Sequence, residues 1–192
     1  MPKPNVKEKI LEAGLHLIHL NGFNGCSVQD ITSFAGVPKG SFYNHFSSKD
    51  ELALYALDRF WTNGDERRDI LKNNDIEPVA RLREFFNLLT KAIINNNYEK
   101  GCLIGNMSTE LSIHQIFREK LTSLYDSWKI LVEECVQEAK DKELIRINLP
   151  AASIADFLIN SWEGATMRAK VEKSSKPFDE FDQVIFSSLF SQ

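Results

Sequence analysis

The residues best suited to recognise another molecule stand together between positions 39 and 45. This run reads Lys-Gly-Ser-Phe-Tyr-Asn-His, and Phe46 follows it. In a helix, Phe42 and Phe46 are four residues apart and share one face, which we expect to pack inward. The side chains on the other arcs are polar: Ser41, Tyr43, Asn44 and His45. Such hydrogen-bonding and aromatic groups suit the phosphates, base edges and thymine methyl groups of DNA.

Two neighbouring residues extend this surface. Gly40 has no side chain, so the backbone there can approach DNA closely. Lys49 stands at the expected start of the following helix, where its charge and the unpaired backbone N–H groups suit a phosphate. We therefore interpret residues 39–49 as a candidate nucleic-acid surface.

The three cysteines are odd in number and far apart, which is neither a disulfide framework nor a zinc spacing and fits a reducing cytoplasm. Cys102 follows Gly101 at an expected helix start, with Lys100 beside it. A helix N-terminus and a nearby cation both favour a reactive thiolate, so Cys102 is a candidate sensor of electrophiles. The alternative is a small buried core residue, the commonest fate of a free cysteine. We interpret Cys26 and Cys135 as structural.

Other candidate chemistry is sparse. His16 and His19 are three residues apart and Glu110 and His114 four apart, but two ligands do not make a metal site. The sequence contains no G-x-S-x-G, no phosphate-binding loop and no dinucleotide fingerprint. We therefore predict a protein that is not an enzyme and needs no metal or cofactor.

The elements that must position these residues are predicted to be helices. Nearly every segment has helical periodicity, and no segment alternates convincingly as a strand would, so we predict an all-α fold of about nine helices. We expect the helices to cover about 4–20, 27–35, 38–46, 48–61, 78–94, 102–111, 113–142, 150–173 and 177–190. The polar stretch 71–77 is interpreted as a connection.

Local signals mark the first helices. Ser27 with Asp30, and Ser48 with Glu51, are capping boxes that begin the second and fourth helices. Phe34 is expected on the inner face of the second helix. Three short helices before a long one, with the tight turn Ala35-Gly36-Val37, form a helix-turn-helix pattern, in which the second helix of the pair enters the major groove.

The charge is unevenly distributed along the chain. The net charge is −4, but residues 1–50 carry five Lys and four Asp or Glu, a balance of +1. A mildly basic head on an acidic body suits a protein that offers DNA one face only. No segment approaches the length of apolar sequence that a membrane span needs, so we expect no membrane partner. We predict a helix-turn-helix DNA-binding domain over 1–47 and a C-terminal helical domain over 48–192.

Residues 27–52, SVQDITSFAGVPKGSFYNHFSSKDEL, resemble the DNA-binding segment of the TetR family of repressors. The shared pattern is A-G-V, then K-G-x-x-Y-x-H-F, then x-S-K-x-x-L. Pro38 departs from it, because the family often has Ser or Thr there, and this difference would remove one phosphate contact. The resemblance implies that Lys3 and Lys7 form a basic arm. It implies that the residues touching DNA are Ser27, Lys39, Gly40, Ser41, Tyr43, Asn44, His45 and Lys49.

The segment 101–106, followed by Glu110-Leu111, resembles the TetR subgroup of the N-ethylmaleimide-responsive repressor, whose matching cysteine senses electrophiles. The resemblance implies a ligand-responsive regulator that binds palindromic operator DNA and is released by a small-molecule inducer. It implies a homodimer formed through the last two helices, about 150–190, and a C-terminal domain for effector binding and dimerisation. The alternative on the same scaffold is a thiol-based sensor that uses Cys102. The residues expected to line an effector site are Trp61, Phe86, Cys102, Met107, His114, Tyr125, Trp128 and Trp162.

Gly164 interrupts the helix predicted over 150–173. A glycine inside a helix costs about 1 kcal/mol relative to alanine. We expect this cost to be offset either by a close helix crossing at the dimer interface or by room for a ligand.

Overall fold

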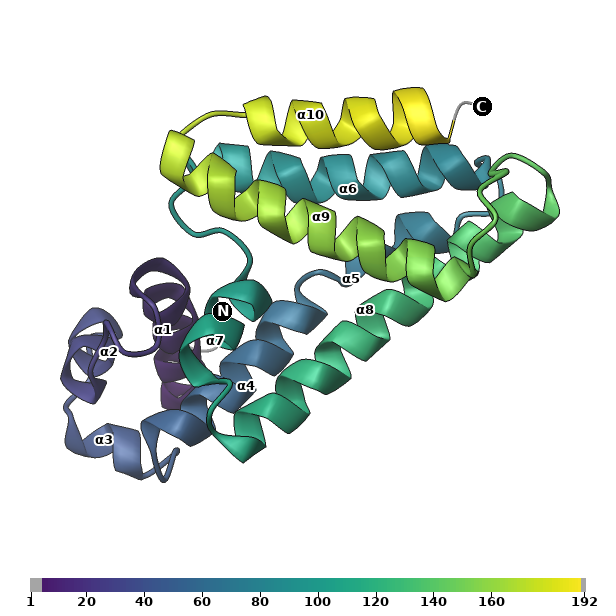
Figure 1. Cartoon of the computed structure of the whole chain (residues 1–192). Coiled ribbons are helices and arrows are strands. Elements are labelled where there is room, and N and C mark those ends of the chain that lie inside the picture. The colour runs from purple at the N-terminus through teal and green to yellow at the C-terminus, as the bar shows by residue number, and fades with distance from the viewer. Residues whose placement is uncertain (1–4, 191–192) are drawn as a thin grey trace. The chain divides into compact units, whose positions relative to one another are not determined.

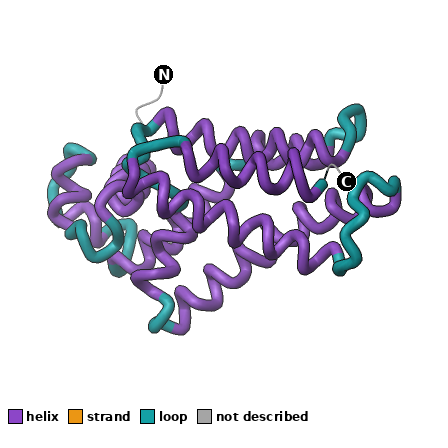
Figure 2. Tube along the Cα trace, turned by 45° about the horizontal axis from the view of Figure 1, so that its top comes forward, coloured by secondary structure: helices purple, strands orange, loops and turns teal. Residues whose placement is uncertain are grey.

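The computed structural model describes residues 5–190, and all regular elements within this range are helices (Figures 1 and 2). The all-α prediction is confirmed. The α-helices are α1 Val6–Asn21, α2 Val28–Phe34, α3 Gly40–Tyr43, α4 Lys49–Thr62, α5 Asp65–Arg68, α6 Pro78–Asn95, α7 Leu103–Leu111, α8 Gln115–Asp141, α9 Ala151–Glu172 and α10 Lys176–Val184. A 3-10 helix, η1 Asp69–Lys72, follows α5, and a π-helical turn, η2 Ile185–Leu189, extends α10. Among the described residues, no helix is both long and apolar enough to cross a membrane.

The predicted helices agree with these bounds to within a few residues, except around 65–72. Pro4, the expected start of the first helix, lies outside the described residues. The sequence pattern assigned no helix to 65–72, where α5 and η1 form. Asp65 and Glu66 stand in the first turn of α5, and Arg67 and Arg68 in its last. This order of charges stabilises a short helix through its dipole, which apolar periodicity does not reveal.

The chain divides into two compact units. The first contains the residues up to Asn63 together with Leu103–Leu121, and the second contains Gly64–Cys102 together with the residues from Thr122 onward. The packing of the first unit therefore includes α4 and α7 in addition to the helix-turn-helix. The limits of the DNA-binding domain, residues 1–47, remain a prediction.

The first unit is built around α1 and α4, which pack against each other. Their apolar faces are buried together with the anchors of α2 and α3. The side chains shielded from solvent are Ile10, Ile18, Ile31, Phe42, Phe46, Leu52 and Leu57. This core holds α2 and α3 against the longer helices. Helices of seven and four residues would not be stable in isolation, so they depend on this packing.

The second unit is a helical bundle in which α6, α9 and α10 lie side by side (Figure 1). Its core is largely aromatic. The ring of Phe86 contacts Trp162, Phe181 and Phe186, and the ring of Trp128 contacts those of Phe85 and Trp162. Aromatic pairs of this kind contribute about 0.5–1.5 kcal/mol each beyond the area they bury.

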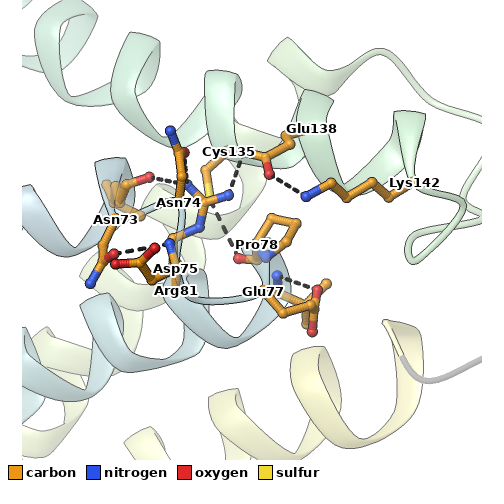
Figure 3. Close-up of polar contacts among 11 residues, drawn as sticks. Asn73, Asn74, Asp75, Glu77, Pro78, Arg81, Cys135, Glu138 and Lys142 are labelled. Atoms are coloured by element: carbon orange, nitrogen blue, oxygen red, sulfur yellow. Dashed lines mark hydrogen bonds and ion pairs between the residues drawn. The ribbon is translucent and has the colours of Figure 1, made fainter.

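A buried arginine joins α6 to α8 within the second unit (Figure 3). The Arg81 guanidinium donates to the Leu71 carbonyl at 2.9 Å and forms an ion pair with Glu138. The nearby Cys135 thiol donates to the Pro78 carbonyl at 3.3 Å, and burial raises the pKa of this thiol to about 11. These contacts support the interpretation of Cys135 as a structural residue.

Candidate nucleic-acid interface

The start of α2 is held by a complete capping box. The Ser27 hydroxyl accepts from the Asp30 N–H at 3.1 Å, and the Asp30 carboxylate accepts from the Ser27 N–H at 2.8 Å. The Ser27 hydroxyl also donates to the Asp30 carboxylate, at 2.7 Å, and this bond together with that from the Ser27 N–H lowers the pKa of Asp30. The predicted box is confirmed, and it orients the first helix of the pair.

The turn between α2 and α3 depends on Gly36. Its φ of +67° lies in the left-handed region, which other residues adopt only with strain. The Gly36 N–H donates to the Ser33 carbonyl and the Val37 N–H to the Thr32 carbonyl, at 3.2 and 3.0 Å. These bonds close the last turn of α2 and send the chain into α3.

The two phenylalanines near α3 pack inward as predicted. Phe42 and Phe46 are both fully buried, and their ring centroids lie 5.7 Å apart. The expected polar residues stand at the surface around them: Lys39, Gly40, Tyr43 and Asn44 are exposed, and Ser41 and His45 are half-buried. The structure thus gathers six of the predicted DNA-contacting residues on α3 and the residues directly flanking it, and their contact with DNA stays a prediction.

The prediction that Phe34 packs inward is wrong. Its side chain is 59% exposed and stacks on the His16 ring at 4.9 Å. Ile31 is buried as predicted, and Thr32 takes the inward position in place of Phe34; the Thr32 hydroxyl donates to the Val28 carbonyl at 2.9 Å. Because that internal hydrogen bond satisfies the hydroxyl, a threonine can take the buried position.

The cap of α4 differs from the predicted capping box. The Ser48 hydroxyl accepts from the Glu51 N–H at 3.1 Å, as expected. The Glu51 carboxylate, however, accepts from the N–H and hydroxyl of Ser47, at 2.6 and 2.7 Å. These bonds from Ser47 lower the pKa of Glu51. Glu51 therefore orders the segment between α3 and α4 one residue earlier than the pattern predicts.

Lys49 is engaged inside the first unit. Its ammonium donates to the carbonyls of Phe23 and Cys26, each at 2.9 Å, and lies 4.0 Å from the centroid of the Phe23 ring. These contacts tie the start of α4 to the loop between α1 and α2. The geometry supports a positioning role for Lys49, and its predicted contact with phosphate remains untested.

Glu110 on α7 binds the same loop. Its carboxylate accepts from the backbone N–H of Phe23 at 3.2 Å and of Asn24 at 2.8 Å. The sequence pairs Glu110 only with His114, four residues on, and gives no sign of its bonds to this loop. His114 is exposed and places its ring 6.5 Å from that of Phe117. Among the described residues there is no group of three or more potential metal ligands.

The basic arm is only partly described. Lys3 lies outside the described residues. The Lys7 ammonium lies 4.7 Å from the centroid of the Tyr55 ring and 5.6 Å from that of Phe46. This cation–π geometry places Lys7 beside the segment that anchors α3.

The residues predicted for an effector site fall in both units. Phe86, Trp128 and Trp162 belong to the aromatic core of the second unit, and Tyr125 lies half-buried on α8 in that unit. Cys102 is only 6% exposed and also belongs to the second unit. The members that belong to the first unit are Trp61, Met107 and His114.

Glu163 is a polar residue of the second unit that sequence reasoning missed. The Cys102 thiol hydrogen-bonds to its carboxyl group, and burial raises the pKa of Glu163 in spite of that bond. Its Oε1 is buried and has no hydrogen-bond partner among the described residues. No pattern in the sequence links positions 102 and 163.

An exposed apolar stripe runs along α9. Phe157, Met167 and Val171 are 55%, 62% and 84% exposed. Together with Asn160 and Gly164 they follow one another at alternating spacings of three and four residues, so they lie on one face of the helix. A Cβ on Gly164 would meet no atom within 4 Å. Packing within the chain therefore does not explain this glycine, and the stripe resembles the seam of a helix pair.

Two segments of the chain match the profiles of known protein families. Residues 10–56 match the family profile described as bacterial regulatory proteins, tetR family. Residues 78–185 match the profile described as the tetracyclin repressor-like C-terminal domain. The first match covers the helix-turn-helix, and the second covers more than half of the chain.

Individual proteins are similar along nearly the whole length. The HTH-type transcriptional repressor DhaR of Mycobacterium sp. strain GP1 is 38% identical over 193 residues, covering 98% of this chain and 94% of the relative. A regulatory protein TetR from Rhodobacter sphaeroides superimposes with a TM-score of 0.86 at 27% identity, covering 92% of this chain and 94% of that one. The reduced form of Escherichia coli NemR shares the fold, with a TM-score of 0.80 at 22% identity and 92% of each chain covered.

Proposed function

Since the chain belongs to the TetR family of bacterial regulatory proteins, we propose that it is a repressor that binds palindromic operator DNA as a homodimer and leaves it when a small molecule binds. Members of this family are helix-turn-helix transcriptional regulators and not enzymes. We place the protein in the cytoplasm, where its DNA is.

The observation that carries the proposal is that one face of α3 is apolar and buried while the other is polar and exposed. Phe42 and Phe46 fix this element by burial, while Lys39, Tyr43 and Asn44 stand at the surface. A rigidly anchored helix with exposed hydrogen-bonding side chains suits the major groove. In a symmetric dimer, two such helices would enter successive major grooves on one face of the duplex.

The exposed stripe on α9 supports the homodimer. Phe157, Met167 and Val171 present apolar side chains to solvent, and Gly164 between them leaves room for the close approach of another helix. On α10, Val184 is also exposed. Apolar surface at heptad-like spacing on the last two helices is what a second copy would cover.

Release would follow from a shift between two dimer conformations. An effector can weaken DNA binding only by as much as it prefers the conformation whose heads do not fit the operator. The aromatic second unit, with Trp128 and Trp162, is the region we propose for the effector. Its side chains, mostly apolar with few polar groups, are of the kind that lines small-molecule sites.

Covalent sensing by Cys102 is the second candidate. Its thiol is hydrogen-bonded to Glu163, which gives a proton acceptor for the addition of the sulfur to an electrophile. The same carboxyl group supplies no positive charge to stabilise a thiolate. Treatment with N-ethylmaleimide distinguishes the two, because Cys102→Ser would keep release by a non-covalent inducer and lose release by the electrophile.

The test of the proposal is binding to the DNA upstream of the protein's own gene. We expect the purified dimer to retard this fragment in a gel and to protect a palindromic sequence, with an affinity that falls steeply as salt rises. A scrambled fragment of equal length is the control. Equal binding to both fragments, or none at low salt, would contradict the proposed function.

A further inference from the structure

Five side-chain polar atoms of the second unit are buried without a hydrogen-bond partner among the described residues, and three of the five do not belong to arginines. These three are the Trp128 Nε1, the Glu163 Oε1 and the Thr166 Oγ1. Trp128 and Thr166 are 4% and 3% exposed. A buried polar group without a partner costs about 1–3 kcal/mol, so such atoms call for an explanation.

These atoms belong to one neighbourhood. Glu163 and Thr166 are three residues apart on α9, and Trp162 and Thr166 are four apart, so all three side chains lie within one arc of the helix. The Trp128 ring lies 5.9 Å from that of Trp162. The Cys102 thiol contacts the Glu163 carboxyl group from the end of the segment before α7.

The neighbouring indole of Trp162, by contrast, has a hydrogen-bond acceptor for its N–H group. The Trp162 Nε1 donates to the Thr90 hydroxyl at 3.1 Å. Trp128 has the same donor at similar burial and no such acceptor. The difference between the two tryptophans therefore lies in the partner and not in burial.

We propose that Trp128, Glu163 and Thr166 form the polar end of an effector site for an uncharged small molecule with an apolar body and a group that both accepts and donates hydrogen bonds, such as a primary amide. This inference rests on the proposed function and adds the class of ligand. The acceptor atom of the ligand accepts a hydrogen bond from the Trp128 N–H. The polar group of the ligand also forms hydrogen bonds with Glu163 and Thr166. The apolar body packs against the rings of Phe86 and Trp162.

The charge of the site selects an uncharged ligand. Burial raises the pKa of Glu163, and no ion pair within residues 5–190 involves its carboxyl group. A carboxylate ligand would then be buried without a counter-charge, which is costly. An alkylammonium ion would offer no acceptor to the Trp128 N–H.

The test compares matched ligands that differ only in the polar group. Primary amides of four to eight carbons, the corresponding carboxylates and the corresponding alkylammonium ions are added to the full-length protein at pH 7.5 without DNA. Binding is measured by calorimetry and by the rise in melting temperature that a ligand of the folded state produces. We expect at least one amide to bind, and its carboxylate and ammonium counterparts to bind at least 10-fold more weakly.

Variants separate recognition from folding. Thr166→Val removes one hydroxyl at nearly constant shape and should weaken amide binding about 3- to 10-fold. Glu163→Gln keeps a hydrogen-bonding group of the same shape and should bind within a few-fold of the wild type, whereas Glu163→Leu should lose binding. The matched control is Thr32→Val in the first unit, a buried hydroxyl that already bonds to the Val28 carbonyl, and it should leave amide affinity unchanged.

The inference is overturned if no amide of the series binds, if Thr166→Val has no effect on affinity, or if alkylammonium ions bind best and lose affinity in Glu163→Gln. Operator binding is measured separately and without these ligands. A protein that binds its operator but no amide disproves this inference alone. Amide binding without binding to DNA would instead contradict the proposed function.

Discussion

A Cβ atom placed on Gly22 would lie 2.4 Å from the Glu110 Oε1. Gly22 also has a φ of +82°, in the region where other residues are strained. The absence of a side chain at this position lets the Glu110 carboxylate reach the N–H groups of Phe23 and Asn24. Lys49 binds the carbonyls of the same loop, so α4 and α7 together determine the conformation of the chain between α1 and α2.

Gly22→Ala is expected to lower the free energy of unfolding by about 2–3 kcal/mol, because it adds backbone strain and displaces Glu110. In a Glu110→Ala background the added cost should fall to about 1 kcal/mol, since only the strain remains. Urea unfolding of the four proteins in this double-mutant cycle measures both values. An equal cost in both backgrounds would mean that the contact with Glu110 is not its source.

Gly40→Ala is expected to act on DNA binding and not on stability. A Cβ on Gly40 would meet no atom within 4 Å, and its φ is not positive. Because alanine favours a helix, the free energy of unfolding should be unchanged or slightly higher. The operator dissociation constant should rise about 10-fold, or 1.4 kcal/mol, since the methyl group would stand where the backbone approaches DNA. Normal affinity in a gel shift would remove Gly40 from the proposed interface.

Lys39→Ala and Lys49→Ala should have different effects. Lys39 is exposed, and its loss should reduce the slope of log affinity against log salt by about 1, as for a phosphate contact. Lys49 is held by two carbonyls, so its loss should mainly lower stability, by about 1–3 kcal/mol. Fluorescence anisotropy across a salt series, with urea unfolding alongside, distinguishes the two. A reduced slope for Lys49→Ala at wild-type stability would restore the phosphate role that the sequence suggests.

Features set by neighbouring residues could be predicted from the sequence, and features set by distant residues could not. The box at Ser27, the turn at Gly36 and the burial of Phe42 follow from local spacing. The partners of Glu110 and Glu163 are 61 to 87 positions away, and no helical period reports such pairs. The exposure of Phe34 also escaped prediction, since a seven-residue helix offers too few positions to define its inner face.

Met167→Glu is expected to convert the homodimer to a monomer. The substitution would bury a charge in the stripe on α9 that we assign to the interface, and a buried unpaired charge costs several kcal/mol. Ile130→Glu on α8 is the matched control, because Ile130 is 53% exposed and lies outside that stripe. Sedimentation velocity should show a monomer for the first variant and a dimer for the second. A dimer in both would place the interface elsewhere.

Alkaline pH should destabilise the second unit through Cys135. Burial raises the pKa of this thiol from 9.0 to about 11, so between these values the unfolded chain has lost the proton that the folded chain still binds. Where the folded state binds more protons, stability falls as pH rises. From pH 8 to pH 10 the expected loss is about 1 kcal/mol, given about 1.4 kcal/mol for each unit of pKa. Cys135→Ala has no thiol to titrate, so its free energy of unfolding should fall by about 1 kcal/mol less than that of the wild type between pH 8 and pH 10. Removing the sulfur changes stability equally at every pH and does not affect this comparison. Urea unfolding of both proteins at pH 8, 9 and 10 measures the difference, and parallel curves would show that the Cys135 thiol ionises as readily in the folded protein as in the unfolded chain.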